Sequence, residues 1–224
     1  MSAPTRRLFL AVLFAAPLAA LAAPTAFAAG RNDTTSYLTP PSFNAADKAR
    51  IAKATAYLQA LATAQGRFEQ TDFRGRIIGG NYYIARPGRI RFEYDAPSSL
   101  LIVSDGKQVR MWDPRLKSMD KYPLDETPLS LFLSRQIRFD QGVVITQVTS
   151  SAQGFTLKAR DRRKQIEGSV TLSFTQSPDG NVALHDWTVV DAQNHGTTVR
   201  LATLARGGAI SPDLFVLNVP GGKK

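Results

Sequence analysis

The residues that could support acid–base chemistry are few, and they do not form a catalytic set. The sequence has two histidines and no cysteine. His185 and Asp186 are adjacent, within the run Leu184-His185-Asp186-Trp187-Thr188-Val189, whose composition predicts a strand. Adjacent side chains of a strand point to opposite faces, so we expect no orienting hydrogen bond between them. The pair therefore indicates a polar surface position, and His195, in a turn, is interpreted in the same way.

The carboxylate pair Asp125-Glu126 is a second candidate for acid–base catalysis. It directly precedes Thr127, the expected cap of a short helix, and negative charge is favoured at a helix N-terminus, so we interpret it as a capping pair. The absence of cysteine excludes thiolate nucleophiles and iron–sulfur ligation, and no phosphate loop or paired-histidine helix occurs. The sequence predicts no enzyme, no metal site and no cofactor.

The chain is strongly basic, with 28 Lys and Arg against 18 Asp and Glu. The densest basic run, Arg160-Asp161-Arg162-Arg163-Lys164, lies between two predicted strands, which indicates a solvated hairpin tip. An export signal at residues 1–28 would keep the chain away from nucleic acid. The charge therefore favours contact with anionic headgroups or an acidic protein surface.

Residues 1–28 have the pattern of a cleaved signal peptide. Arg6 and Arg7 precede an apolar stretch over Leu8–Leu21, and Ala26-Phe27-Ala28 gives a small-x-small cleavage site. The stretch is short for a membrane span. The arginine pair leaves both the general and the twin-arginine export routes open. We expect residues 29–44, rich in Thr, Pro, Ser and Asn, to form a flexible lead-in.

Residues 45–224 are expected to form one domain that begins with a helix and continues as strands. Asn44 is the predicted helix cap, with Asp47 in the first turn, and the helix is expected to end near Gly66. The later period is two, as where Ile90, Phe92 and Tyr94 alternate with charged residues. Similar runs follow at 108–111, 155–159, 170–174, 184–190 and 198–204, separated by turn signals. This spacing predicts an antiparallel meander.

A short apolar helix is expected to interrupt the strands, with Thr127 as its cap and proline at its first position. One long and one short helix are too few to cover the concave face of so large a sheet, so an incompletely filled space for an apolar ligand is expected. The composition of this face is also that of an ordinary packed core, which is the alternative. The predicted inward-facing residues are Tyr82, Ile84, Ile90, Phe92, Tyr94, Val109, Met111, Trp187 and Val189.

The sequence resembles the outer-membrane lipoprotein carrier family, the LolA-type periplasmic chaperones. The resemblance rests on Tyr82–Tyr94 with its Arg86-Pro87-Gly88 motif, on Ile102-Val103-Ser104-Asp105-Gly106-Lys107, and on Asp113-Pro114. Gly66-Arg67-Phe68-Glu69-Gln70 is similar to the family's first strand, Thr127-Pro128-Leu129 to the start of its lid helix, and Ser211-Pro212-Asp213-Leu214-Phe215 to its last strand.

The resemblance implies an α+β, mainly β fold: an incomplete (unclosed) antiparallel β-barrel with a helical lid over an apolar cavity. It implies that Arg86 bonds to lid backbone and locks the cavity closed, and that Ile90 and Phe92 line it. The lid residues would be Pro128, Leu129, Leu131 and Phe132. Ile90 stands where the family often has a larger aromatic, which implies a different cavity shape.

The implied function is that of a monomeric periplasmic chaperone. Its cargo would be acylated lipoproteins, taken from an inner-membrane ATP-driven lipoprotein-releasing complex and passed to an outer-membrane acceptor lipoprotein, with no nucleic acid involved. The acceptors share the fold but need a lipidated N-terminal cysteine, which this sequence lacks. Two alternatives are a lipid- or lipoprotein-sensing envelope-stress binding domain of the same fold, and an envelope hydrolase, for which a nucleophile–base pair is missing.

Overall fold

The computed structural model describes residues 39–127, 129–139, 142–162 and 168–217. The helices are α1 (Ala45–Ala60), α2 (Ser130–Leu133) and the 3-10 helices η2 (Leu124–Glu126) and η3 (Pro212–Phe215). The strands are β1 (Thr63–Thr71), β2 (Ile77–Ala85), β3 (Arg89–Tyr94), β4 (Leu101–Asp105), β5 (Gln108–Asp113), β6 (Ser118–Pro123), β7 (Val143–Ser151), β8 (Gly154–Asp161), β9 (Ser169–Gln176), β10 (Val182–Val190), β11 (Gly196–Leu201) and β12 (Ala205–Arg206).

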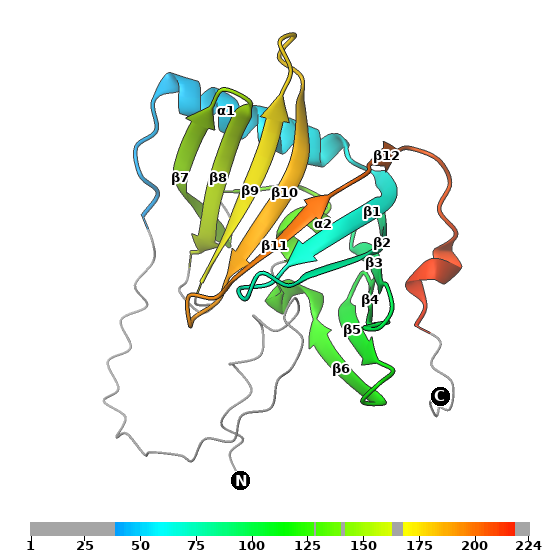
Figure 1. Cartoon of the computed structure of the whole chain (residues 1–224). Coiled ribbons are helices and arrows are strands. Elements are labelled where there is room, and N and C mark those ends of the chain that lie inside the picture. The colour runs from blue at the N-terminus through cyan, green and yellow to red at the C-terminus, as the bar shows by residue number, and fades with distance from the viewer. Residues whose placement is uncertain (1–38, 128, 140–141, 163–167, 218–224) are drawn as a thin grey trace, which may run out of the picture.

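All strands belong to one antiparallel sheet made of two meanders (Figure 1). One meander runs from β1 to β6 and the other from β7 to β11, and the pairing of β1 with β11 joins them. Strands β6 and β7 end the strand order, each with one partner among the described strands, so the sheet does not close. The predicted mainly β fold, an unclosed antiparallel sheet with helices, is confirmed.

Helix α1 begins where the sequence predicts. The Asn44 side chain accepts a hydrogen bond from the Asp47 amide at 2.8 Å, which satisfies one of the amides left free at the start of a helix. The helix crosses one face of β7–β10 (Figure 1) and buries Ala54, Tyr57 and Leu58 against it. It thereby covers the concave side of the second meander.

The predicted helix end near Gly66 is wrong, because α1 stops at Ala60 and Gly66 lies inside β1. Residues 63–71 pair with β2 on one side and with β11 and β12 on the other, and this pairing overrides their local helical propensity. A Cβ atom on Gly66 would lie 2.1 Å from the Thr203 carbonyl oxygen, so the close approach of the two backbones requires glycine.

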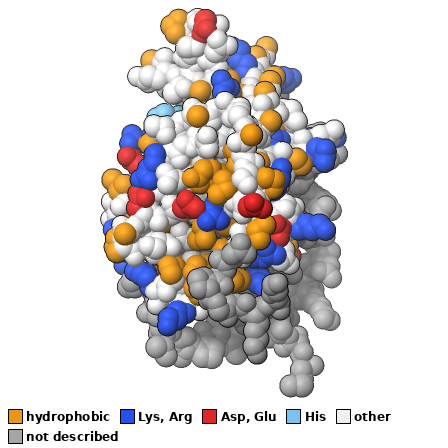
Figure 2. Space-filling view, turned by 90° about the vertical axis from the view of Figure 1, so that its right-hand side faces the viewer, with side chains coloured by type: hydrophobic (Ala, Val, Ile, Leu, Met, Phe, Trp, Pro, Cys, Tyr) orange, Lys and Arg blue, Asp and Glu red, His pale blue; other side chains and the backbone are white. Residues whose placement is uncertain are grey.

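The outer face of the first meander is covered near the C-terminus. Helix η3 contacts β3 and β4, and Phe215 forms a small second cluster with Ala85 and Val103. Residues 211–215, expected to be a strand, form this 3-10 helix instead, with the Ser211 side chain accepting from the Asp213 amide at 3.3 Å. Figure 2 looks onto this side of the molecule, where basic and acidic side chains are interspersed with apolar ones.

The short helix between the meanders is shorter than predicted. Helix α2 begins at Ser130, and its N-cap, Leu129, makes no side-chain capping bond. Thr127 is not its cap, because the Thr127 hydroxyl donates to the Leu124 carbonyl at 2.8 Å. Asp125 and Glu126 lie in η2, a separate helix ahead of α2, so the capping interpretation of this pair is wrong.

The predicted signal peptide, residues 1–28, and residues 29–38 of the lead-in lie outside the described residues. Residues 39–44 of the lead-in have neither helix nor strand structure. None of the helices in the described part of the chain is long and apolar enough to cross a lipid bilayer.

Candidate functional site

The structure brings the nine predicted inward-facing residues together. All are buried and belong to one apolar cluster, and Tyr82 and Phe92 are fully enclosed. The cluster also contains apolar side chains from α1, from strands β8, β9 and β11, and from the segment after η2. It therefore lies between the two meanders, on the concave side of the sheet, where α1 and α2 cover it.

Aromatic rings from both meanders meet at the centre of this interior. The Phe68 ring lies 5.0 Å from those of Phe92 and Tyr94, edge to face in both pairs, and Phe92 contacts Trp187 at 6.3 Å between ring centroids. Phe68 is not among the predicted lining residues, although its segment resembles the family's first strand. The alternation of Phe68 and Gln70 with the polar Arg67, Glu69 and Thr71 is the pattern of a half-buried strand.

The interior side chains are packed against one another, so an apolar ligand would enter only if they part. Two pockets of about 280 and 410 Å³ lie away from this cluster's centre. The smaller lies beside η3, between Arg91 and Leu214. The larger is lined by hydroxyl side chains of β7, β8 and β9, by His185, and by Phe155 and Phe174 of the interior cluster, so it reaches the edge of that cluster.

Two buried tyrosines give the interior a small number of fixed polar contacts. The Tyr94 hydroxyl donates to Gln70 Oε1 at 2.6 Å, and the Tyr82 hydroxyl donates to the Thr203 carbonyl at 2.9 Å. Burial raises the pKa of Tyr94, and burial together with the nearby Tyr57 raises the pKa of Tyr82. Both side chains therefore remain neutral hydrogen-bond donors, and the interior holds no charge of theirs.

Arg86 connects the two helices that cover the interior. It directly follows β2, and its guanidinium donates from Nη1 to the Leu58 carbonyl in the last turn of α1 and from Nη2 to the Ser134 carbonyl at the end of α2. Carbonyls in the last turn of a helix are natural acceptors for such a donor, and the Leu58 carbonyl also accepts from the Leu61 amide at 3.3 Å. Burial lowers the pKa of Arg86, but a guanidinium stays charged in proteins. Its buried Nε makes no hydrogen bond within the described part of the chain.

The turn after Arg86 supports the same contact through its backbone. The Gly88 amide donates to the Leu133 carbonyl of α2 at 2.8 Å. Behind the turn, the buried Ser104 hydroxyl donates to the Gly88 carbonyl at 2.7 Å. Gly88 has a φ of +79°, and a Cβ atom there would lie 2.5 Å from Gly106 Cα. Glycine is thus required both by the backbone conformation and by the close approach of the two turns.

The predicted lid residues have different outcomes. Leu129, directly before α2, is buried in the interior cluster, and so is Leu133, which was not among the predicted lid residues. Pro128 lies outside the described residues. Leu131 and Phe132 belong to the backbone of α2, but their side chains lie outside the description.

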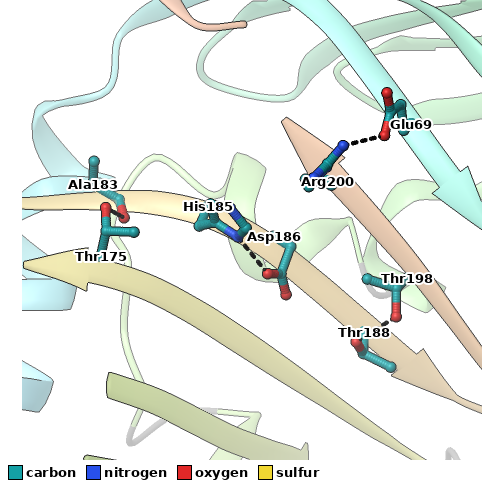
Figure 3. Close-up of polar contacts among 8 residues, drawn as sticks. All are labelled: Glu69, Thr175, Ala183, His185, Asp186, Thr188, Thr198 and Arg200. Carbon is teal, nitrogen blue, oxygen red and sulfur yellow. Dashed lines mark hydrogen bonds and ion pairs between the residues drawn. The ribbon is translucent and has the colours of Figure 1, made fainter. Parts of the chain in front are cut away.

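The expectation that His185 and Asp186 cannot interact is wrong. The pairing of β10 with β9 shifts between Leu184 and Asp186, which leaves His185 as the extra residue of a β-bulge. His185 Nδ1 and Asp186 Oδ2 therefore lie 2.7 Å apart on the exposed face (Figure 3), near the Thr188–Thr198 and Arg200–Glu69 contacts. Among the described residues, no serine or threonine hydroxyl bonds to His185, so a nucleophile–base pair is missing.

The chain is similar in sequence to known outer-membrane lipoprotein carrier proteins. The family model for the outer membrane lipoprotein carrier protein LolA matches residues 59–218. An outer-membrane lipoprotein carrier protein of Pseudomonas fluorescens is 28% identical over 187 residues, which cover 79% of this chain and 87% of the relative. One from Methylobacillus flagellatus is 25% identical over 176 residues, covering 75% and 83%. A LolA superfamily protein from Nitrosomonas europaea matches in structure with a TM-score of 0.44 and 9% identity, covering 76% and 97%.

Proposed function

Because the chain belongs to the LolA family of outer membrane lipoprotein carrier proteins, which transport rather than catalyse, we propose that it is a periplasmic chaperone for acylated lipoproteins. Residues 45–224 act as one carrier domain that shelters the acyl chains between the two meanders. The cargo comes from an inner-membrane ATP-driven complex and goes to an outer-membrane acceptor lipoprotein.

The contact made by Arg86 is the observation that supports this proposal most. A single charged side chain holds the carbonyl ends of α1 and α2 together over a largely apolar interior. Such a contact is directional. It can be broken without leaving the guanidinium charge buried and unpaired, because Arg86 is only part-buried and water can reach it. The arrangement therefore suits a closed empty state that opens when an apolar ligand enters.

The free energy of acyl burial explains why a carrier needs such a closure. Burying one CH₂ group is worth about 0.8 kcal/mol, so a fully sheltered 16-carbon chain would contribute roughly 12 kcal/mol. Three such chains would exceed the ~18–21 kcal/mol at which non-covalent affinities saturate, and the cargo would not be released. We use the name α2 segment for residues 129–137, which contain α2. Opening of the α2 segment on loading offsets part of this gain in free energy. Its closing on release then favours the empty state.

The proposal is tested by equilibrium binding of an environment-sensitive apolar dye to the protein without its first 28 residues. We expect dye fluorescence to rise on binding and to fall when a triacylated peptide is added. The same peptide without acyl chains is the matched control and should displace no dye. Absence of a dye signal, or equal displacement by both peptides, would contradict the proposal.

A further inference from the structure

We propose that Gln59 is a second positioning residue, which holds the chain after α2 against the end of α1 independently of Arg86. Its amide makes two hydrogen bonds to the backbone of this segment. Gln59 Nε2 donates to the Arg135 carbonyl at 2.9 Å, and the Ile137 amide donates to Gln59 Oε1 at 2.9 Å. One side chain thus pairs with residues two apart, as an adjacent strand would.

The two bonds fix a buried apolar side chain as well as the backbone. Ile137 belongs to the interior cluster and is 5% exposed, whereas its neighbours Arg135 and Gln136 are exposed. Gln59 itself lies on the exposed side of α1, next to the buried Leu58. It therefore reaches over the end of the helix and holds in place the backbone from which Ile137 enters the interior.

The chemistry of this contact requires an amide. A glutamine side chain offers one donor group and one acceptor, and here each has a partner of the opposite kind. A glutamate could still accept from the Ile137 amide, but it could not donate to the Arg135 carbonyl and would place negative charge beside that oxygen. A leucine of similar size would lose both bonds. These two substitutions separate the shape of the side chain from its hydrogen bonding.

Gln59 and Arg86 act on consecutive parts of the same junction. Arg86 bridges the carbonyls of Leu58 and Ser134. Gln59, the residue after Leu58, bonds directly to the backbone of Arg135 and Ile137. Arg86 therefore holds the end of α2, and Gln59 holds the irregular segment, residues 135–137, that follows it. This assignment rests on the proposed function in that separation of the segment from α1 is the movement that admits acyl chains.

The test is hydrogen exchange of individual amides in the empty protein, measured by NMR. With Gln59→Leu we expect exchange at the Ile137 amide to rise about tenfold, as for the loss of a hydrogen bond that protects it, while amides of β3 stay protected. Gln59→Glu should raise it less, because the bond from the Ile137 amide survives. The rate at which the protein takes up the apolar dye should be highest in Gln59→Leu, lower in Gln59→Glu and lowest in the wild type.

Gln136→Leu is the matched control, because the Gln136 side chain is exposed and makes no hydrogen bond within the described part of the chain. It should leave both exchange and dye uptake as in the wild type. Unchanged exchange at Ile137 in Gln59→Leu would overturn the inference, as would faster exchange throughout the sheet. If exchange changes as expected but neither the wild type nor any variant binds dye, the positioning role of Gln59 holds and the proposed carrier function is wrong.

Discussion

The two helices that cover the interior differ in how they are held. Helix α1 has 16 residues, a side-chain cap from Asn44 and three residues buried against the second meander. Helix α2 has four residues, no side-chain cap, and backbone carbonyls at its end that bond to Arg86 and Gly88. An isolated turn of this length has no stability of its own. Its position therefore depends on the residues that contact it from outside.

This difference indicates which part of the cover can move. Helix α1 cannot leave the second meander without exposing Ala54, Tyr57 and Leu58 to water, which costs several kcal/mol. The α2 segment buries Leu129 and Leu133, and the polar contacts it makes with other described elements come from the side chains of Gln59 and Arg86 and from the turn at Gly88. We therefore expect α1 to act as a fixed cover and the α2 segment to act as a removable one.

The largest expected effect comes from truncating a buried leucine in each helix region. Leu58 in α1 and Leu129 before α2 are 2% and 1% exposed. Leu58→Ala should lower the free energy of unfolding by about 3 kcal/mol, since it leaves a cavity in the fixed cover. Leu129→Ala should cost less by at least ~1 kcal/mol, because the segment can open while the sheet stays folded. Urea unfolding monitored by tryptophan fluorescence measures both losses.

The two substitutions form a direct comparison because the bond from Arg86 to Leu58 uses the backbone and survives truncation of the side chain. Equal losses for Leu58→Ala and Leu129→Ala would show that the two helices unfold together with the sheet. The distinction between a fixed and a removable cover would then be wrong.

A smaller effect is expected at the turn that holds α2. Gly88→Ala should cost about 2–3 kcal/mol, because the backbone has a positive φ and the new Cβ would collide with Gly106. Gly75→Ala is the matched control, since Gly75 has a φ of +78° with nothing within 4 Å of an added Cβ. It should cost only the conformational strain of about 1 kcal/mol. Thermal unfolding gives the difference, and similar melting temperatures would exclude the contact with Gly106 as a cause.

The smallest effect concerns the start of α1. Asn44→Ala should lower the free energy of unfolding by about 1 kcal/mol, because the amide of Asp47 loses its acceptor. Thr55→Ala in the same helix should cost little or nothing, since the Thr55 hydroxyl bonds back to the Ile51 carbonyl and alanine favours helix more strongly. Urea unfolding of the two variants compares them, and a cost for Thr55→Ala as large as for Asn44→Ala would contradict the capping argument.

Features determined by local periodicity were predictable from the sequence. The cap at Asn44, the alternation through Ile90 and Phe92 and the antiparallel meander all follow from the spacing of apolar and polar residues. The burial of all nine inward-facing residues follows from the same alternation, because one face of each strand is directed towards the interior. Their role in binding acyl chains stays a prediction.

Features determined by pairing between distant strands were not predictable. The contact of the Phe68 ring with the rings of Phe92 and Tyr94 depends on the pairing of β1 with β2 and of β2 with β3. The bond between His185 and Asp186 depends on a bulge that only the pairing of β9 with β10 creates. Residues 212–215 form a 3-10 helix on the outer face of β3 and β4, two strands that each already pair with two neighbours in the sheet.

If Arg86 holds a removable cover, loading and delivery should separate in Arg86→Leu. Uptake of a lipoprotein from inner-membrane vesicles and its transfer to an outer-membrane acceptor are measured in the same preparation. Arg89→Leu is the matched control, because Arg89 lies over the Phe215 ring on the outer face, 5.4 Å from its centroid.

We expect Arg86→Leu to take up cargo at nearly the wild-type level and to lose transfer, while Arg89→Leu completes both steps. The substitution removes the polar contact that favours closing and adds apolar surface to the interior, so the loaded state is favoured. Transfer at the wild-type level, or loss of both steps together with a lowered melting temperature, would contradict the claim.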